Sequence, residues 1–336
     1  MIYIGLLGFF FTEYIRPTSY IPALTVLHLN SLVPLSTVAA SLVSAGQATI
    51  YRMANEPNVK MIAGILALIW LSFMTADVQE FAWNTLSIVF GFSLMTWVIG
   101  SEVTTVRKLK GLIITLVVVH LIVAALNPVL FTDPETRHYV TSGAFLGDGN
   151  DYSLSINVIV PLCLFLLLDS RRIIVKLLWA GAILVLVAGV VVTQSRGGTI
   201  GLVCVGAYYW TKSRRKAQTG FMIVLVVGLI LALAPGNYFA RMGMISDTTE
   251  GSASARLTAW AIARQMAYDS PLLGVGAGHF GVKIGKEYRP TNFAGSGMTA
   301  HSIYFLALGE LGFPGLILLL SFIISNLRAR FHSIGR

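Results

Sequence analysis

Long apolar runs separated by short polar segments are the dominant pattern of this sequence. A helix needs about 20 mostly apolar residues to cross the hydrocarbon core of a bilayer. The pattern therefore predicts an all-α, polytopic integral membrane protein with about ten transmembrane helices. The first run is short, and Pro22 and Pro34 in the second predict a broken or partly interfacial helix. The predicted segments are 1–12, 21–44, 59–76, 81–100, 109–130, 153–168, 173–193, 198–211, 220–235 and 300–325.

Basic residues cluster in alternate connections between these segments. Fifteen of the 24 Lys and Arg residues fall in such short loops and tails, where positive charge marks the cytoplasmic side. The bias predicts that both termini are cytoplasmic. The clusters are Arg52/Lys60, Arg107/Lys108/Lys110, Arg171/Arg172/Lys176, Lys212/Arg214/Arg215/Lys216 and Arg328/Arg330/Arg336.

The composition agrees with a membrane protein and argues against other classes. Hydrophobic residues make up 55% of the 336 positions, and charged residues make up 12%, about half the share of a soluble domain. These values rule out a disordered chain and disfavour a soluble enzyme. The net charge of +9 lies in loop clusters, so we expect no nucleic-acid partner. Cys163 and Cys204 lie in apolar runs and predict neither a disulfide framework nor a metal site.

The side opposite the basic clusters carries loop 131–152, a turn at 195–198 and the long connection 236–299. Six basic and four acidic residues give this connection a net charge of +2, on the side where positive charge is disfavoured. An anionic ligand would explain that excess. We therefore predict one membrane domain, 1–336, with N-terminal spans in 1–130 and a loop subdomain of short helices at 236–299.

The sequence Ser195-Arg196-Gly197-Gly198 joins two apolar runs and places a guanidinium group at the end of a helical hairpin. Two glycines allow close backbone approach and positive φ angles. Exposed amides at a helix N-terminus, together with Arg196, would form a cradle for a phosphate group. The alternative is a tight turn whose arginine only reaches lipid headgroups.

Residues 252–264 predict a helix that Ser252 or Ser254 caps. Three side chains at intervals of four residues share one helical face, namely Arg256, Trp260 and Arg264. Three neighbours extend the apolar side, namely Leu257, Ala261 and Ile262. The segment is either an interfacial amphipathic helix whose arginines bind lipid phosphates, or a face that binds the diphosphate of a lipid ligand.

His301 opens the last predicted span and is expected to share a helical face with Tyr304, Phe305 and Leu308. An imidazole gains and loses a proton near neutral pH, which makes it a natural general base for a hydroxyl nucleophile. The alternative is an interfacial histidine without a chemical task.

Glu310 lies nine residues beyond His301, roughly 14 Å deeper along an ideal helix. A carboxylate at that depth is costly and is by default functional or paired, so we expect a structural ion pair. Nine residues also place Glu310 on the face opposite His301, unless the glycines and proline at 309–315 break the helix.

Several chemistries have no motif in the sequence, including metal-dependent, zinc, serine-hydrolase and nucleotide-hydrolysing reactions. Gly274-Val-Gly276-Ala-Gly278 resembles half of a dinucleotide loop, but no predicted strand precedes it. Ionisable residues are scarce inside the predicted spans, which disfavours an ion-coupled transporter. We therefore expect neither a metal nor a cofactor.

Taken together, these segments resemble the O-antigen ligase/polymerase superfamily, most nearly the O-glycosylation ligases of exosortase and exopolysaccharide systems. The resemblance covers 147–320, about half of the chain. The sequence departs from the family in two ways. It has Ser302 where many members carry asparagine after the histidine, and it has fewer predicted spans than members usually have. The matching segments are Gly147–Asn150, Ser195–Gly197, Lys212–Lys216, Gly251–Trp260, Pro271–Gly274, His301–Tyr304 and Gly309–Gly312.

The resemblance implies a fold like that of GT-C-type lipid-linked glycosyltransferases. It also implies metal-independent, inverting transfer of a glycan from an undecaprenyl-diphosphate carrier to a glycan, lipid or protein acceptor, at the periplasmic face of the bacterial inner (plasma) membrane. It assigns the catalytic base to His301 and diphosphate binding to Arg196 and Arg256. The expected supporting residues are Ser195, Trp260, Arg264, Ser302, Tyr304 and Glu310.

Three other functions stay open on the sequence alone. A polymerase of the same superfamily would use a second lipid-linked glycan as acceptor. A lipid or polysaccharide transporter would perform no covalent chemistry. A purely structural membrane subunit would tolerate substitution of the histidine and both arginines.

Overall fold

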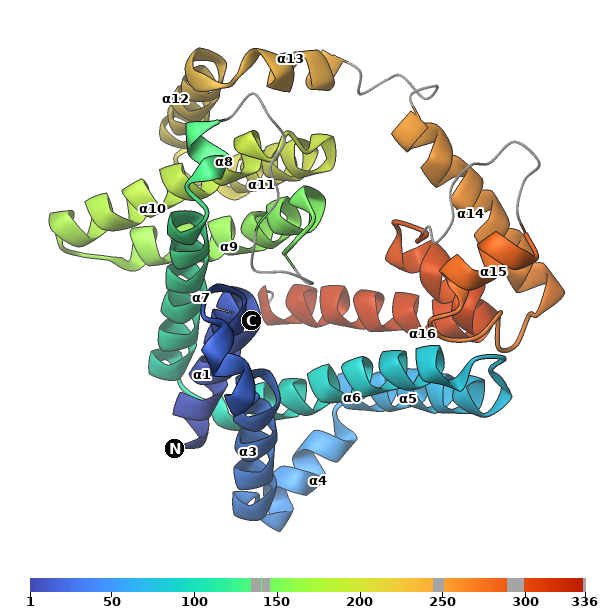
Figure 1. The fold of residues 1–336 in the computed structure, drawn as a ribbon. Helices are drawn as coiled ribbons and strands as arrows, with labels where there is room; N and C mark the ends of the chain where they lie inside the picture. The colour runs from blue at the N-terminus through green and yellow to red at the C-terminus, as the bar shows by residue number, and fades with distance from the viewer. Residues whose placement is uncertain (134–139, 141–145, 244–250, 289–298, 335–336) are drawn as a thin grey trace. The chain divides into compact units, whose positions relative to one another are not determined.

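The computed structural model describes residues 1–133, 140, 146–243, 251–288 and 299–334. Every regular element in these residues is a helix (Figure 1), which confirms the predicted all-α fold. The helices are α1 (Ile2–Ile15), α2 (Pro17–Tyr20), η1 (Pro22–Leu27), α3 (Leu29–Ser44), α4 (Gln47–Asn55), α5 (Pro57–Thr75), α6 (Gln79–Glu102), α7 (Val106–Leu126), α8 (Val129–Thr132), α9 (Gly149–Asp169), α10 (Ile173–Val192), α11 (Arg196–Lys212), α12 (Lys216–Leu233), α13 (Gly236–Gly243), α14 (Gly251–Asp269), α15 (Phe280–Lys286) and α16 (Ile303–Ile334).

Seven helices in the described residues are long and apolar enough to cross a membrane, fewer than the ten that we predicted. The three other predicted segments correspond to shorter helices, because α1 has 14 residues, α11 has 17, and the apolar part of α12 is Lys216–Gly228. Fourteen residues cover only about 21 Å of a core about 30 Å thick. The seven are Pro22–Ser44, Pro57–Met74, Gln79–Glu102, Val106–Leu126, Gly149–Asp169, Ile173–Val192 and Ile303–Arg328.

The second of the predicted segments is broken as expected, but Pro34 lies inside α3 and the break falls at His28. The 3-10 helix η1 ends at Leu27, and His28 adopts a left-handed conformation with a φ of 44° before α3 begins.

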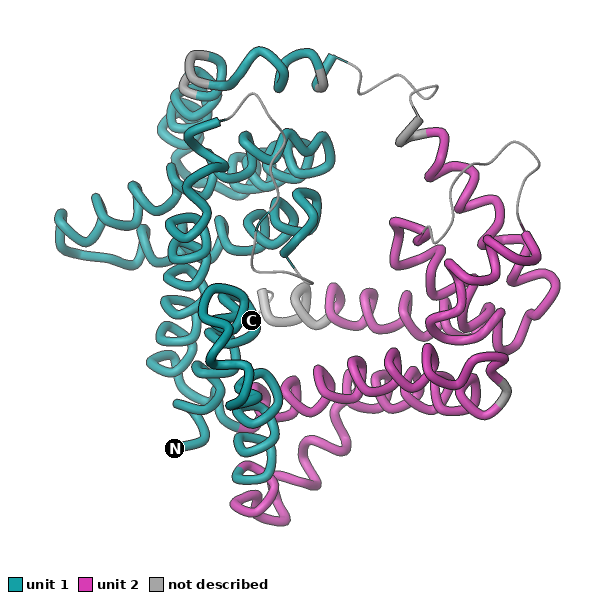
Figure 2. Tube along the Cα trace, in the orientation of Figure 1, with its two compact units in different colours: residues 1–40, 102–246 teal, residues 41–101, 247–336 magenta. Residues whose placement is uncertain are grey.

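The chain forms two compact units (Figure 2). Unit 1 comprises residues 1–40 and 102–246, and unit 2 comprises 41–101 and 247–336. Each unit thus combines segments that are far apart in the sequence, and each has its own hydrophobic core.

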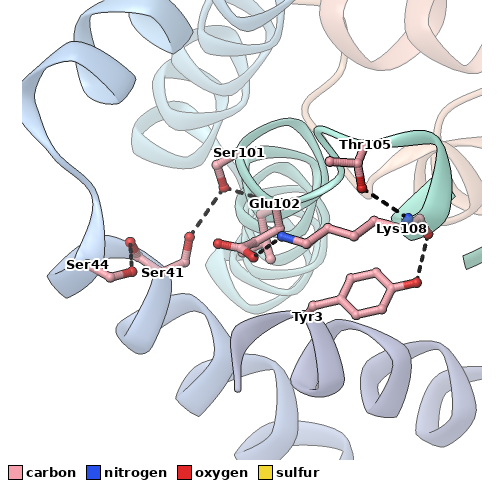
Figure 3. Close-up of polar contacts among 8 residues, drawn as sticks. Tyr3, Ser41, Ser44, Ser101, Glu102, Thr105 and Lys108 are labelled. Carbon is pink, nitrogen blue, oxygen red and sulfur yellow. Dashed lines mark hydrogen bonds and ion pairs between the residues drawn. The ribbon is translucent and has the colours of Figure 1, made fainter. Parts of the chain in front are cut away.

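The core of unit 1 lies among α7, α9 and α10 and includes Val117, Ile156 and Leu186. Helix α1 packs along α7, where the hydroxyl of Tyr3 donates to the carbonyl of Lys108 at 2.7 Å (Figure 3). The side chain of Thr105 caps α7, and Lys108 Nζ lies 3.2 Å from Glu102 (Figure 3). These contacts fix the start of α7 against the N-terminal helix. The side-chain cap and the hydrogen-bond distances are typical of a helix N-terminus.

In unit 2, α16 packs against both α5 and α14. Asn58 and Asn326 exchange amide hydrogen bonds of 2.9 and 3.1 Å, which hold the start of α5 beside the later turns of α16. The main core cluster joins α14, α15 and the residue before His301, and it is built from Ala259, Ile262, Ala263, Met266, Phe280, Ile284 and Ala300.

Helix α16 is broken at Gly312, whose φ of 67° is not helical. Pro314 has no N–H, so the carbonyl of Glu310 lacks its donor one turn later. That carbonyl accepts instead from the N–H of Gly276 at 3.1 Å. Two further backbone bonds of 2.9 Å run from Val275 to Gly309 and from Phe313 to Pro271. The segment before α15 thus satisfies polar groups exposed by the break, as an apolar environment requires.

Candidate active site

Unit 1 contains the predicted turn around Ser195, where α10 ends and α11 begins. Ser195 Oγ accepts from the N–H of Gly198 at 3.1 Å and thereby caps α11. Arg196 is the first residue of α11 and is partly exposed. The predicted combination of a guanidinium group with a helix N-terminus is therefore present. The left-handed conformation, which we expected at the glycines, falls instead on Gln194 with a φ of 51°.

Two side chains of α9 bind this turn. Ser195 Oγ donates to Asn150 Oδ1 at 2.8 Å, and Asn157 Nδ2 donates to the carbonyl of Gly198 at 2.8 Å. A Cβ on Gly198 would lie 2.5 Å from Ser153, so this glycine serves close helix approach and not backbone freedom. Sequence reasoning missed both asparagines as site residues. Their available signal was a polar amide at the start of, or inside, an otherwise apolar helix.

In unit 2, the helix predicted at 252–264 is α14. The indole N–H of Trp260 donates to the carbonyl of Ala300 at 2.9 Å. Its ring also stacks on Phe305, with centroids 5.0 Å apart and an interplanar angle of 10°. Arg256 is partly exposed and Arg264 is exposed. Trp260 therefore packs against the start of α16 through both its N–H group and its ring.

The buried face of α14 differs from the predicted apolar side. Leu257 is 49% exposed and Ala261 is exposed, whereas only Ile262 of the predicted three is buried. The core is instead formed by small side chains and one methionine, namely Ala259, Ala263, Met266 and Ala267. Helical periodicity alone could not distinguish these faces, because alanine occurs on both.

His301 lies before α16 and not on it, since the helix begins at Ile303. Its φ of 47° is in the left-handed region, and its side chain is exposed. The prediction that His301 shares a helical face with Tyr304, Phe305 and Leu308 is therefore wrong. Tyr304 is 47% exposed, Ser302 is partly exposed, and the Ser302 carbonyl accepts from Leu306 N–H at 2.8 Å.

Glu310 is buried, and its carboxylate oxygens accept from backbone amides. Oε2 accepts from Gly278 N–H at 2.9 Å and Oε1 from Phe280 N–H at 3.1 Å. Within the described residues its partners are these amides, so the expected ion pair is not found there. The structure buries this carboxylate, and the sequence did not reveal its partners, because they lie about 30 residues away in the sequence.

The glycines of Gly274-Val-Gly276-Ala-Gly278 form the loop that receives Glu310. All three have positive φ angles of 62°, 105° and 74°. A Cβ on Gly278 would lie 2.7 Å from the carbonyl oxygen of Phe81. The glycine spacing thus reflects a tight loop against α6 and α16.

His279 follows this loop and is fully buried. Its Nε2 accepts from the N–H of Val78 at 3.1 Å, and its Nδ1 donates to the carbonyl of Ala277 at 2.9 Å. These two bonds define a neutral tautomer with the proton on Nδ1. Sequence reasoning missed this residue, which connects α15 to the turn between α5 and α6.

Lys283 adds an ionic link at the same place. Its Nζ lies 2.6 Å from Asp77 and 2.6 Å from Glu287. Hydrogen bonding and charge from Lys283 lower the pKa of Asp77, and the hydrogen bonds to Asp77 and Glu287 raise the pKa of Lys283. Lys283 is 14% exposed and Asp77 is 62% exposed, so water screens the carboxylate side of this pair.

The candidate residues divide between the two units. Ser195 and Arg196 belong to unit 1, and the others belong to unit 2, namely Arg256, Trp260, Arg264, His301, Ser302, Tyr304 and Glu310. The approach of Arg196 to His301 stays a prediction. In the part of the chain that the structure describes, no three His, Cys, Asp or Glu side chains are grouped as a metal site.

The fold and these residues define a helical, multi-pass membrane protein with cationic and imidazole side chains at helix ends. Residues 182–320 match the O-antigen ligase family model. This match supports the resemblance of the chain to the O-antigen ligase superfamily. The matched segment runs from α10 into α16, lies within the resembling region 147–320, and contains every candidate residue. No curated protein matches the chain.

Proposed function

We propose that this protein is a membrane glycosyltransferase of the O-antigen ligase type. In the proposed reaction, a glycan moves from an undecaprenyl-diphosphate carrier to an acceptor hydroxyl at the periplasmic face of the bacterial inner membrane. The family match supports glycan transfer, and the matched segment contains the three residues on which the mechanism depends: Arg196, Arg256 and His301.

His301 acts as the general base and takes the proton of the acceptor hydroxyl. The hydroxyl oxygen attacks the anomeric carbon from the face opposite the diphosphate, so that the configuration inverts. The bond from the anomeric carbon to the diphosphate oxygen breaks, and undecaprenyl diphosphate departs with the electron pair. Arg196 and Arg256 neutralise its charge, a task for which a bidentate guanidinium group is well suited.

The observation that carries the proposal is the connection between Arg256 and His301 within unit 2. Trp260 follows Arg256 by one helical turn, and it donates a hydrogen bond to Ala300, the residue before His301. A cation for the leaving group and a base for the nucleophile are thereby attached to one packed core.

The distribution of charge supports an extracytoplasmic site. The Asn58–Asn326 pair brings Lys60 and Arg328 to one end of the α5–α16 pair. His301 precedes the other end of α16. If the basic end is cytoplasmic, as the positive-inside bias predicts, His301 faces the periplasm.

The test compares His301→Ala with His28→Ala in membranes supplied with a lipid-linked oligosaccharide. Both histidines are exposed and left-handed, with φ angles of 47° and 44°, so the control removes an imidazole from a similar backbone conformation. We expect His301→Ala to reduce transfer by about 10²–10⁴-fold and His28→Ala to retain it. Full transfer by a folded His301→Ala variant would remove the base from the mechanism.

Arg256 is tested against Arg328, a cation on the C-terminal part of α16. We expect Arg256→Ala to abolish transfer and Arg328→Ala to leave it unchanged, with equal amounts of both variants in the membrane. If the two variants transfer equally well, Arg256 does not bind the leaving group.

The acceptor separates a ligase from a polymerase of the same superfamily. Mass analysis of the product distinguishes the two, because a ligase adds one block and a polymerase produces a ladder. A transporter would instead deliver the unchanged lipid-linked glycan to the far side of a vesicle.

A further inference from the structure

The backbone around His301 is held on both sides although the imidazole itself is exposed. Ala300 has no exposed surface and belongs to the core cluster with α14 and α15. His301 has a φ of 47°, a region that residues other than glycine rarely adopt. Such a conformation persists where the surrounding structure determines it. A specific contact must therefore hold this turn.

Trp260 supplies that contact in two ways. Its indole N–H donates to the carbonyl of Ala300, and its ring stacks on Phe305 in the first turn of α16. The two contacts lie on either side of His301 in the sequence. One side chain thus holds the residue before the left-handed turn and the helix after it.

The same side chain connects the turn to the proposed leaving-group cation. Arg256 precedes Trp260 by four residues on α14, which is about 6 Å along the helix axis. A shift of α14 relative to α16 would therefore move Arg256 relative to His301, and Trp260 lies at the contact that opposes such a shift.

We propose that Trp260 is a positioning residue, which orients the His301 imidazole through the Ala300 carbonyl and sets its distance from Arg256. The inference rests on the proposed function, because it assigns to Trp260 a role in placing the catalytic base. The positioning role depends on the indole N–H donor, because any aromatic side chain could supply the stacking face.

The experiment compares Trp260→Phe with Trp97→Phe in the full-length protein. Phenylalanine preserves a ring that can stack on Phe305, and it removes the N–H donor together with the second ring of the indole, a loss of volume that Trp97→Phe shares. Trp97 on α6 is the matched control, because its Nε1 is buried and has no hydrogen-bond partner among the described residues. Initial rates are measured against the concentration of a lipid-linked oligosaccharide, per folded molecule, together with melting temperatures.

We expect Trp260→Phe to lower kcat about 10- to 100-fold, with KM for the donor and the melting temperature close to those of Trp97→Phe. Amide hydrogen exchange at residues 300–302 should be faster in Trp260→Phe alone, which is a readout independent of activity and folding yield. An unchanged kcat, a rise in KM alone, or a loss proportional to the loss of folded protein would each overturn the positioning role.

His301→Ala is assayed in parallel to separate this inference from the proposed function. If His301→Ala transfers at the rate of the unmodified protein, the proposed function fails. If His301→Ala loses transfer and Trp260→Phe does not, only the positioning role fails.

Discussion

The carboxylate of Glu310 accepts a hydrogen bond of 2.9 Å from the backbone N–H of Gly278. With a second bond from Phe280, it joins α16 to the loop that leads into α15. Charged groups are costly in an apolar interior unless hydrogen bonds compensate for lost water. Backbone amides supply that compensation here, so Glu310 connects two parts of unit 2.

Glu310→Ala is expected to destabilise the protein because it leaves two N–H groups of the loop without their acceptor. Each unsatisfied group costs about 1–3 kcal/mol, so the free energy of unfolding should fall by about 3 kcal/mol. Thermal unfolding in detergent measures this loss. Glu310→Gln keeps one acceptor oxygen, so its melting temperature should lie between those of the unmodified protein and Glu310→Ala. A melting temperature unchanged by Glu310→Ala would contradict the structural role.

Gly278→Ala is expected to disturb the same loop by another route. The φ of 74° is unfavourable for alanine, and the new Cβ would meet the Phe81 carbonyl and Thr85 Oγ1 at 2.7 Å. Gly285→Ala in α15 is the matched control, since no heavy atom lies within 4 Å of its Cβ position. We expect Gly278→Ala to have a lower melting temperature than the unmodified protein. Gly285→Ala should not, because alanine is favoured over glycine inside a helix. Equal melting temperatures would show that the loop adapts.

Ser195→Ala removes a helix cap at the proposed diphosphate site, and Thr105→Ala removes a cap at the start of α7. In each helix a side-chain oxygen accepts from a backbone N–H, at 3.1 Å for Ser195 and 3.3 Å for Thr105. Both variants should lose about 1 kcal/mol of stability. We expect only Ser195→Ala to reduce glycan transfer as well, because Ser195 also anchors the turn that carries Arg196. Equal activity in the two variants would show that the Ser195 cap has no specific role in glycan transfer.

The Asp77–Lys283 pair predicts a pH dependence of stability. The lowered pKa of Asp77 means that its contribution is present above the unfolded value, about 4, and is lost as the pH falls through the folded value. The raised pKa of Lys283 keeps its contribution below about 10.4 and loses it as the pH rises further. The difference in melting temperature between the unmodified protein and Asp77→Asn should be constant from about pH 6 to 9. It should shrink towards pH 3, and a difference that grows there would refute the pairing.

Transfer is expected to continue in the presence of a chelator. In the proposed mechanism, the positive charge that stabilises the departing diphosphate comes from Arg196 and Arg256. Initial rates with and without EDTA test this, and strong inhibition that added Mg²⁺ or Mn²⁺ reverses would argue for a metal-assisted step.

The elements that sequence reasoning predicted well are those whose signals are local. Helix α14 and the helix start at Arg196 depend on residues within a few positions of one another, so their patterns are visible in the chain. The backbone at His301 and the partners of Glu310 depend on contacts with distant residues, such as Trp260 and Gly278. A helical projection assumes a helix, and it therefore failed at His301, which lies before the first residue of α16.

In the described residues, three of the ten predicted spans form helices shorter than a full crossing. Hydropathy locates an apolar run, but the length of the helix depends on where the backbone turns. In unit 1, the turn at Gln194 fixes the start of α11. The loop that joins α11 to α12 likewise limits both helices.

The discontinuity at Gly312 has a consequence for how the last helix crosses the bilayer. The portion from Pro314 to Arg328 is about 22 Å long at 1.5 Å per residue, shorter than the roughly 30 Å of hydrocarbon. The apolar run of α16 therefore crosses the bilayer only with residues on both sides of the break, and hydrogen bonds from the backbone of residues 271–276 hold these two portions together.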